Sequence, residues 1–91
     1  MATRFMLKEF NRTFATREKG EELREELLTR LDGDVEVLVD FDEVTNVSYS
    51  FADEFLGRLC AETEVQAATA NLTPGVERIV GRAIDRRAGV A

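Results

Sequence analysis

The spacing of hydrophobic residues changes along the chain and predicts strands that alternate with helices. The clearest predicted strand spans residues 35–41, where four apolar residues share one face and Leu38 makes the other face partly apolar. A run of this kind is typical of a central strand with structure packed on both sides. A less regular pattern over 4–15 predicts one or two short strands that turn near Asn11, and small residues over 65–70 predict another strand.

Three segments have the spacing of amphipathic helices. The first follows Thr16, a predicted N-cap, and ends at residues 32–34, whose sequence Asp-Gly-Asp favours a turn. Its leucines share one predicted face and are Leu23, Leu27, Leu28 and Leu31. A second helix is predicted over 51–62, and a third begins at Thr73-Pro74, with Thr as cap and Pro at the first helical position.

This order of elements predicts one α/β domain over residues 1–91, with a mixed, mostly parallel β-sheet and about three crossover helices. So few helices would cover the sheet mainly on one face and leave the other face for a partner. Gly20 interrupts the first helix, and close packing against a neighbouring element explains it better than a functional contact.

Composition argues against most enzymes and against nucleic-acid binding. The net charge is −6, which repels phosphate backbones, and the chain has no His and one Cys, so neither a Ser-His-Asp triad nor a Cys-His pair can form. Glycine-rich phosphate loops are absent from the sequence. We therefore expect no enzymatic activity, cofactor or metal; the one enzyme alternative is a carboxylate site at Asp40, Asp53 and Glu54.

The hydrophobic pattern and the single cysteine both favour a location inside the cell. No apolar run is long enough to span a bilayer, and the first residues lack the apolar core of a signal peptide, so we expect a cytoplasmic protein. Cys60 is alone, which fits a reducing compartment, and a small core residue is the simpler interpretation of it than a reactive thiol.

The segment from Val39 to Gly57 contains an aliphatic strand that ends in Asp-Phe, followed by the run Val-Ser-Tyr-Ser-Phe-Ala-Asp-Glu-Phe. It resembles the STAS-like family DUF4325, and the resemblance extends from about Phe14 to Arg87. That family is related to anti-sigma factor antagonists, which switch partners with a histidine-kinase-type ATPase that acts as a serine kinase. The resemblance implies a regulatory protein-interaction module with a phosphoacceptor at Ser50, or at Ser48 as second candidate.

Ser50 also has a purely structural interpretation. Ser50 and Asp53 have the spacing of a capping box, in which Ser50 would cap the second helix. An alternative function follows from this interpretation: a constitutive structural or assembly subunit, in a defence or toxin-related system, with no phosphorylation. If Ser50 is phosphorylated, the added charge beside Asp53 and Glu54 should weaken binding to a partner with little change in fold.

The predicted interaction surface consists of residues around this motif, and Tyr49 is either an exposed anchor or a partly buried core residue. Its members are Asp42, Glu43, Tyr49, Phe51, Asp53 and Glu54. Asp40, Asp42 and Glu43 could together bind a divalent metal, but they lack the spacing of a calcium loop, and solvation is the simpler interpretation of them. A basic stripe on the third helix, Arg78, Arg82 and Arg86 with adjacent Arg87, is either a solvated face or a docking site for an acidic patch on a partner or on a second copy in a homodimer.

Overall fold

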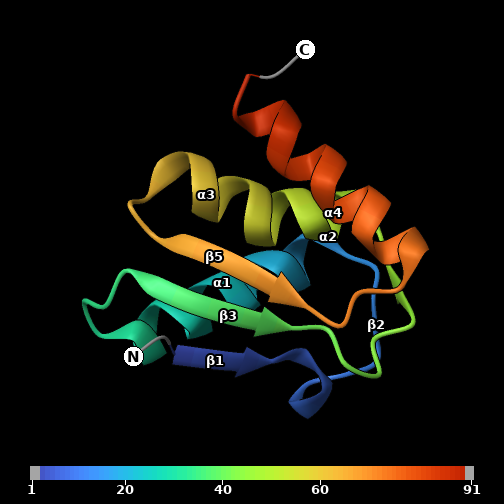
Figure 1. The fold of residues 1–91 in the computed structure, drawn as a ribbon, viewed down its shortest axis with the longest axis horizontal. Coiled ribbons are helices and arrows are strands. Elements are labelled where there is room, and N and C mark those ends of the chain that lie inside the picture. Colours follow the sequence, from blue (N-terminus) through green and yellow to red (C-terminus); the bar gives the residue numbers. More distant parts are fainter. Residues whose placement is uncertain (1–2, 90–91) are drawn as a thin grey trace.

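Two small parallel sheets, three longer helical segments and one short 3-10 helix make up the described part of the fold (Figure 1). The structure is a computed structural model that describes residues 3–89. The strands are β1 (Thr3–Met6), β2 (Thr13–Phe14), β3 (Glu36–Asp40), β4 (Asn46–Val47) and β5 (Gln66–Ala70). The helices are η1 (Leu7–Glu9), α1 (Arg17–Leu31), α2 (Tyr49–Ala52), η2 (Asp53–Gly57), α3 (Arg58–Glu62) and α4 (Pro74–Arg87), of which α2, η2 and α3 follow one another without a break.

The main sheet has the strand order β1-β3-β5, and the second sheet pairs β2 with β4. All of these pairings are parallel, with Thr3 opposite Val37 and Glu36 opposite Gln66 in the main sheet. Parallel neighbours need crossover connections, and the helical segments supply them. The predicted α/β fold with a mostly parallel sheet and three helices is confirmed.

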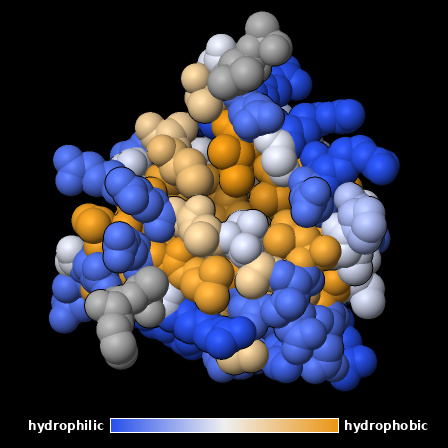
Figure 2. All heavy atoms as spheres, in the orientation of Figure 1, coloured by the Kyte–Doolittle hydropathy of each residue, from blue (hydrophilic) through white to orange (hydrophobic). Residues whose placement is uncertain are grey.

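The helices cover one face of the main sheet. In the view of Figure 1 the strands lie in front of α1. Val37 and Val39 are buried on the covered face, whereas Leu38, on the opposite face, is half-buried and its neighbour Ala68 is exposed. Figure 2 shows apolar residues in the middle of this uncovered face. The expectation of one covered face is confirmed, but the expectation that residues 35–41 are packed on both sides is wrong.

Local signals place the helix ends. The Thr16 hydroxyl accepts a hydrogen bond from the backbone N–H of Lys19, and the Thr73 hydroxyl accepts one from the N–H of Val76. Asp32, with φ of 46°, ends α1 in a left-handed conformation. These caps confirm the predicted starts of α1 and α4 and the predicted end of α1.

Two apolar residues expected in the core lie at the surface. Leu28 is 36% exposed on α1 and Val35 is 44% exposed before β3. The remaining leucines of the predicted α1 face, at positions 23, 27 and 31, are buried. Within residues 3–89, no helix combines the length and the apolar character needed to cross a membrane.

Candidate functional site

The helix that carries the motif begins two residues earlier than predicted. Ser48 is its N-cap, and its hydroxyl accepts a hydrogen bond from the N–H of Phe51 at 3.0 Å. The backbone N–H of Ser48 donates to the carbonyl of Phe14, which continues the pairing of β4 with β2 and holds Ser48 in an extended conformation. The predicted capping box of Ser50 and Asp53 is therefore wrong, because tertiary pairing fixes the cap at Ser48.

Over residues 48–57, only the first three residues reach solvent. Ser48, Tyr49 and Ser50 are half-buried, and every residue over 51–57 is buried. The Phe51 ring stacks on Phe14 with centroids 4.8 Å apart, which accounts for its burial. The prediction that Phe51, Asp53 and Glu54 belong to an exposed interaction surface is thus wrong for these three residues.

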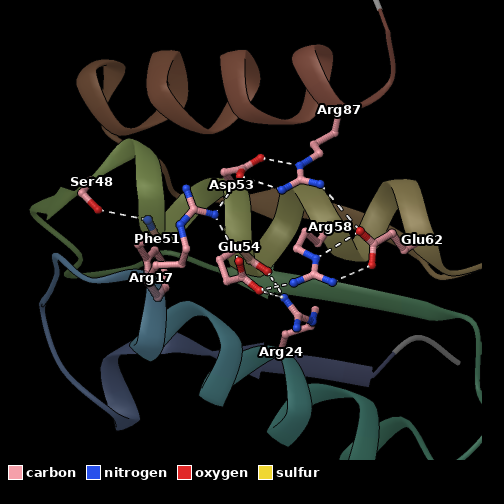
Figure 3. Close-up of polar contacts among 9 residues, drawn as sticks. All are labelled: Arg17, Arg24, Ser48, Phe51, Asp53, Glu54, Arg58, Glu62 and Arg87. Atoms are coloured by element: carbon pink, nitrogen blue, oxygen red, sulfur yellow. Dashed lines mark hydrogen bonds and ion pairs between the residues drawn. The ribbon is translucent and has the colours of Figure 1, made fainter.

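The buried carboxylates are surrounded by arginines from three helical segments (Figure 3). We call this group the arginine–carboxylate cluster: Arg17, Arg24, Asp53, Glu54, Arg58, Glu62 and Arg87. Burial of a charge is costly unless it is paired, and the cluster pairs each of the two buried carboxylates with more than one guanidinium group.

Glu54 lies at the α1 side of the cluster. Its Oε2 accepts hydrogen bonds from Nη1 of Arg24 and Nη1 of Arg58, both at 2.7 Å, and its Oε1 accepts one from Arg17 at 3.1 Å. Arg24 also donates to the Glu54 backbone carbonyl. The side chain of Glu54 thereby fastens α1 to the helix that carries the motif.

Asp53 lies at the α4 side. Arg87 donates from Nε and Nη2 to its two carboxylate oxygens at 2.7 and 2.9 Å, and Arg17 donates at 2.9 Å. Arg87, predicted to extend the exposed basic stripe, therefore turns inward. In Figure 3 Arg17 and Arg87 approach Asp53 from α1 and from α4.

The arginines hold both carboxylates in the charged form. Hydrogen bonding from Arg87, with a further bond from Arg17, lowers the pKa of Asp53 to about 2 against the effect of burial. Burial opposes ionisation of Glu54, yet hydrogen bonds from Arg24, Arg17 and Arg58 lower its pKa to about 2. A carboxylate of this kind is poorly matched to proton transfer near neutral pH, which argues against the carboxylate-enzyme alternative.

The middle of the helix forms a wide π-helical turn, η2, that brings its backbone close to α1 and α4. A Cβ atom on Gly20 would lie 2.8 Å from the carbonyl oxygen of Phe51, and one on Gly57 would lie 3.0 Å from Oδ1 of Asp53. The contact at Gly20 is too short for a side chain, and the one at Gly57 is tight. The explanation of Gly20 by close packing is confirmed.

A polar hollow of about 420 Å³ opens beside the cluster, lined by Arg17, Tyr49, Asp53, Arg86 and Arg87. We call it the arginine hollow. It brings together Tyr49 from the motif and Arg86 from the basic stripe, two residues that no sequence pattern connects. Tyr49 packs partly against the core, and the exposed residues Arg78 and Arg82 do not line the hollow.

The acidic residues after β3 have partners of their own. Asp40 is buried and accepts hydrogen bonds from Asn71, Arg4 and the N–H of Asp42; the bond from Asn71, followed by that from Arg4, lowers its pKa to about 2. Asp42 and Glu43 bind Nζ of Lys8 at 2.9 and 3.2 Å.

Asp40 is therefore not part of the arginine–carboxylate cluster, since it shares no hydrogen-bond partner with Asp53 or Glu54. In the described part of the chain, no three potential His, Cys, Asp or Glu ligands are grouped to hold a metal ion. Cys60 is half-buried on α3, and burial raises the pKa of its thiol.

Comparison with known families tests the family resemblance that the motif over residues 47–55 suggested. Residues 19–74, more than half of the chain, match the family described as STAS-like domain of unknown function (DUF4325). The chain belongs to this family. The part of this STAS-like domain that matches includes Ser48, Asp53 and Glu54, whereas Arg17 and Arg87 lie outside it. No curated protein and no solved structure matches the chain.

Proposed function

We propose that this STAS-like domain is a regulatory protein-interaction module that acts like an anti-sigma factor antagonist, and that phosphorylation of Ser50 switches its binding. The observation that supports the proposal is the exposure pattern of the motif. Over residues 48–57, solvent reaches only Ser48, Tyr49 and Ser50. The Ser48 hydroxyl is engaged as the cap, but within residues 3–89 the Ser50 hydroxyl makes no hydrogen bond and is free to accept a phosphoryl group.

The cluster supplies an electrostatic mechanism for the switch. Ser50 precedes Asp53 and Glu54 by three and four residues, the separations that place helical side chains on one face. Both carboxylates share Nη1 of Arg17. A phosphate on Ser50 would add about −1.5 to −2 charge there, repel the two carboxylates and compete for Arg17. The exposed surface changes its charge while the ion pairs of Arg24, Arg58 and Arg87 with the two carboxylates keep the helix in place.

The proposed partner is a histidine-kinase-type ATPase that acts on serine, by analogy with the proteins to which the family is related. The proposal assigns no catalysis and no cofactor to this chain. A second candidate is a constitutive assembly subunit, favoured by the structural role that Ser48 already has as a helix cap. Under that alternative the surface around Tyr49 binds its partner without modification.

The test compares partner capture from the native cell by tagged wild-type protein and by Ser50→Ala, Ser50→Asp and Ser50→Asn variants. We expect a wild-type species heavier by about 80 Da, the mass of one phosphate. The partner should be retained by the Ala and Asn variants and lost only by Ser50→Asp, because Asn matches Asp in shape without its charge. Equal capture by Ser50→Asp and wild type would contradict the switch and favour the constitutive subunit.

A further inference from the structure

The arginine hollow is a concentration of positive charge on an acidic protein. Three guanidinium groups and one carboxylate line it, from Arg17, Arg86, Arg87 and Asp53, whereas the whole chain carries a net charge of −6. We propose that the arginine hollow binds an oxyanion, a phosphoryl or carboxylate group, carried by an acidic segment of a protein partner. This inference does not require phosphorylation of Ser50.

Several hydrogen-bond donors at the hollow have no partner in the described part of the chain. Arg17 donates to both carboxylates from Nη1 alone, which leaves its Nε and Nη2 groups available. Arg86 makes no ion pair within residues 3–89, and the Tyr49 hydroxyl makes no hydrogen bond there. Guanidinium and phenol groups are the donors that suit planar carboxylates and phosphoryl oxygens.

Two of the three guanidinium groups that line the hollow are also held in place before any ligand arrives. Asp53 anchors Arg17 and Arg87 from opposite sides, and it is itself buried, at 7% exposed. Figure 3 shows the two guanidinium groups converging on this carboxylate. A site whose donors are already ordered loses less conformational entropy when it binds.

The size and surroundings of the hollow favour a protein segment over a polyanion. A volume of about 420 Å³ lies within the range of small-molecule sites, about 300–1,000 Å³, so it can admit the side chain that carries the charge. The acidic remainder of the protein repels a nucleic-acid backbone, which presents many phosphates at once. One charged side chain avoids that repulsion.

The test is an NMR titration of the isotope-labelled, unmodified full chain with O-phosphoserine, glutamate and inorganic phosphate. Arg86→Gln removes one donor that has no internal ion pair, and Arg82→Gln makes the same change of charge one turn earlier on α4, outside the hollow. We expect the resonances of Tyr49 and Arg17 to shift on binding. Arg86→Gln should weaken binding about tenfold or more, and Arg82→Gln less than about twofold.

The probes distinguish the two sources of the oxyanion. Saturation by phosphoserine alone assigns the hollow to a phosphoryl group, and saturation by both amino acids assigns it to carboxylates as well. Equal weakening by the two variants, or no shift at Tyr49 up to about 10 mM of any probe, would overturn the proposal. Tighter binding of a single-stranded oligonucleotide at the same residues would overturn the assignment to a protein partner.

A Ser50→Ala background separates this inference from the proposed switch. Binding at the hollow should persist in that background, because Ser50 does not line it. Binding at the hollow in this background, together with equal partner capture by Ser50→Asp and wild type, would uphold this inference and contradict the proposed switch. Loss of binding in this background would contradict this inference alone.

Discussion

Arg87, at the end of α4, donates two hydrogen bonds from one guanidinium group to the two carboxylate oxygens of Asp53. Asp53 lies 34 residues earlier in the chain. This bidentate pair makes the last turn of α4 part of the arginine–carboxylate cluster. It also orders one wall of the arginine hollow. The stability of the domain and the shape of its candidate binding site therefore depend on the same contact.

Replacing Arg87 by Met should lower the free energy of unfolding by about 1–3 kcal/mol, because it removes a charge-assisted pair and leaves Asp53 with Arg17 alone. Urea denaturation measures the change. Arg78→Met is the matched control on the same helix, since Arg78 is exposed and makes no ion pair within residues 3–89, and it should alter stability by less than about 0.5 kcal/mol. Equal effects of the two substitutions would show that the pair of Arg87 with Asp53 contributes nothing to stability.

Two glycines in helices should respond in opposite directions to alanine. Gly20→Ala places a Cβ 2.8 Å from a backbone carbonyl and should destabilise the protein by about 1–3 kcal/mol. Gly81→Ala, with nothing within 4 Å of the new Cβ, should stabilise α4 by about 0.5–1 kcal/mol. Thermal unfolding of the two variants gives the comparison, and a stabilising Gly20→Ala would contradict the close approach of α1 to the motif helix.

Acid should destabilise the domain over a defined range of pH. The pKa values of Asp40, Asp53 and Glu54 are about 2 in the folded protein, against about 3.9 for Asp and 4.3 for Glu in an unfolded chain. Between those values the unfolded chain binds more protons, so the free energy of unfolding should fall from about pH 5 to about pH 2. The stabilisation is fully present above that range.

Glu54→Gln tests the origin of that pH dependence. The variant should be less stable than wild type at pH 7, and its stability should fall less steeply from about pH 5 to about pH 2. Asp85→Asn, an exposed change on α4, should keep the wild-type slope. Urea denaturation at a series of pH values measures both slopes, and a Gln variant with the full wild-type slope would remove Glu54 from the explanation.

The cap at Ser48 can be distinguished from Ser50 by stability alone. Ser48→Ala should cost about 1 kcal/mol because the N–H of Phe51 loses its acceptor. Ser50→Ala should change stability by less than about 0.5 kcal/mol, since its hydroxyl makes no hydrogen bond within residues 3–89. The reverse order of effects, measured by thermal unfolding, would restore the cap to Ser50.

The sequence predicted the features that depend on local chemistry. Thr16 and Thr73 cap helices as expected because a cap requires only the next few residues. Ser48 and Ser50 both satisfy that local rule, so the choice between them depends on the pairing of β4 with β2, which begins at Thr13 and Asn46. No pattern within the motif itself contains that information.

The burial of Asp53 and Glu54 could not be predicted from the pattern of hydrophobic residues. Asp53 and Glu54 were expected at the surface, as polar residues usually are, and they are buried because arginines from distant positions neutralise them. One signal was present: Arg17 and Arg24 lie seven residues apart, two turns along one side of α1. The partner of that basic side is set by the packing of α1 against η2, a tertiary contact that the sequence of α1 alone does not encode.

The parallel pairing of all the described strands has a consequence for how the chain reaches its native state. The paired residues are Thr3 with Val37, Thr13 with Asn46, and Glu36 with Gln66. Each pairing therefore closes a loop of about 30 residues or more, and none of the described pairings is a hairpin. Non-local pairings of this kind slow folding, because the chain loses loop entropy before the contacts form. During synthesis β3 can pair with β1 well before β5 leaves the ribosome, and one side of the central strand then stays open as a nascent, aggregation-prone edge.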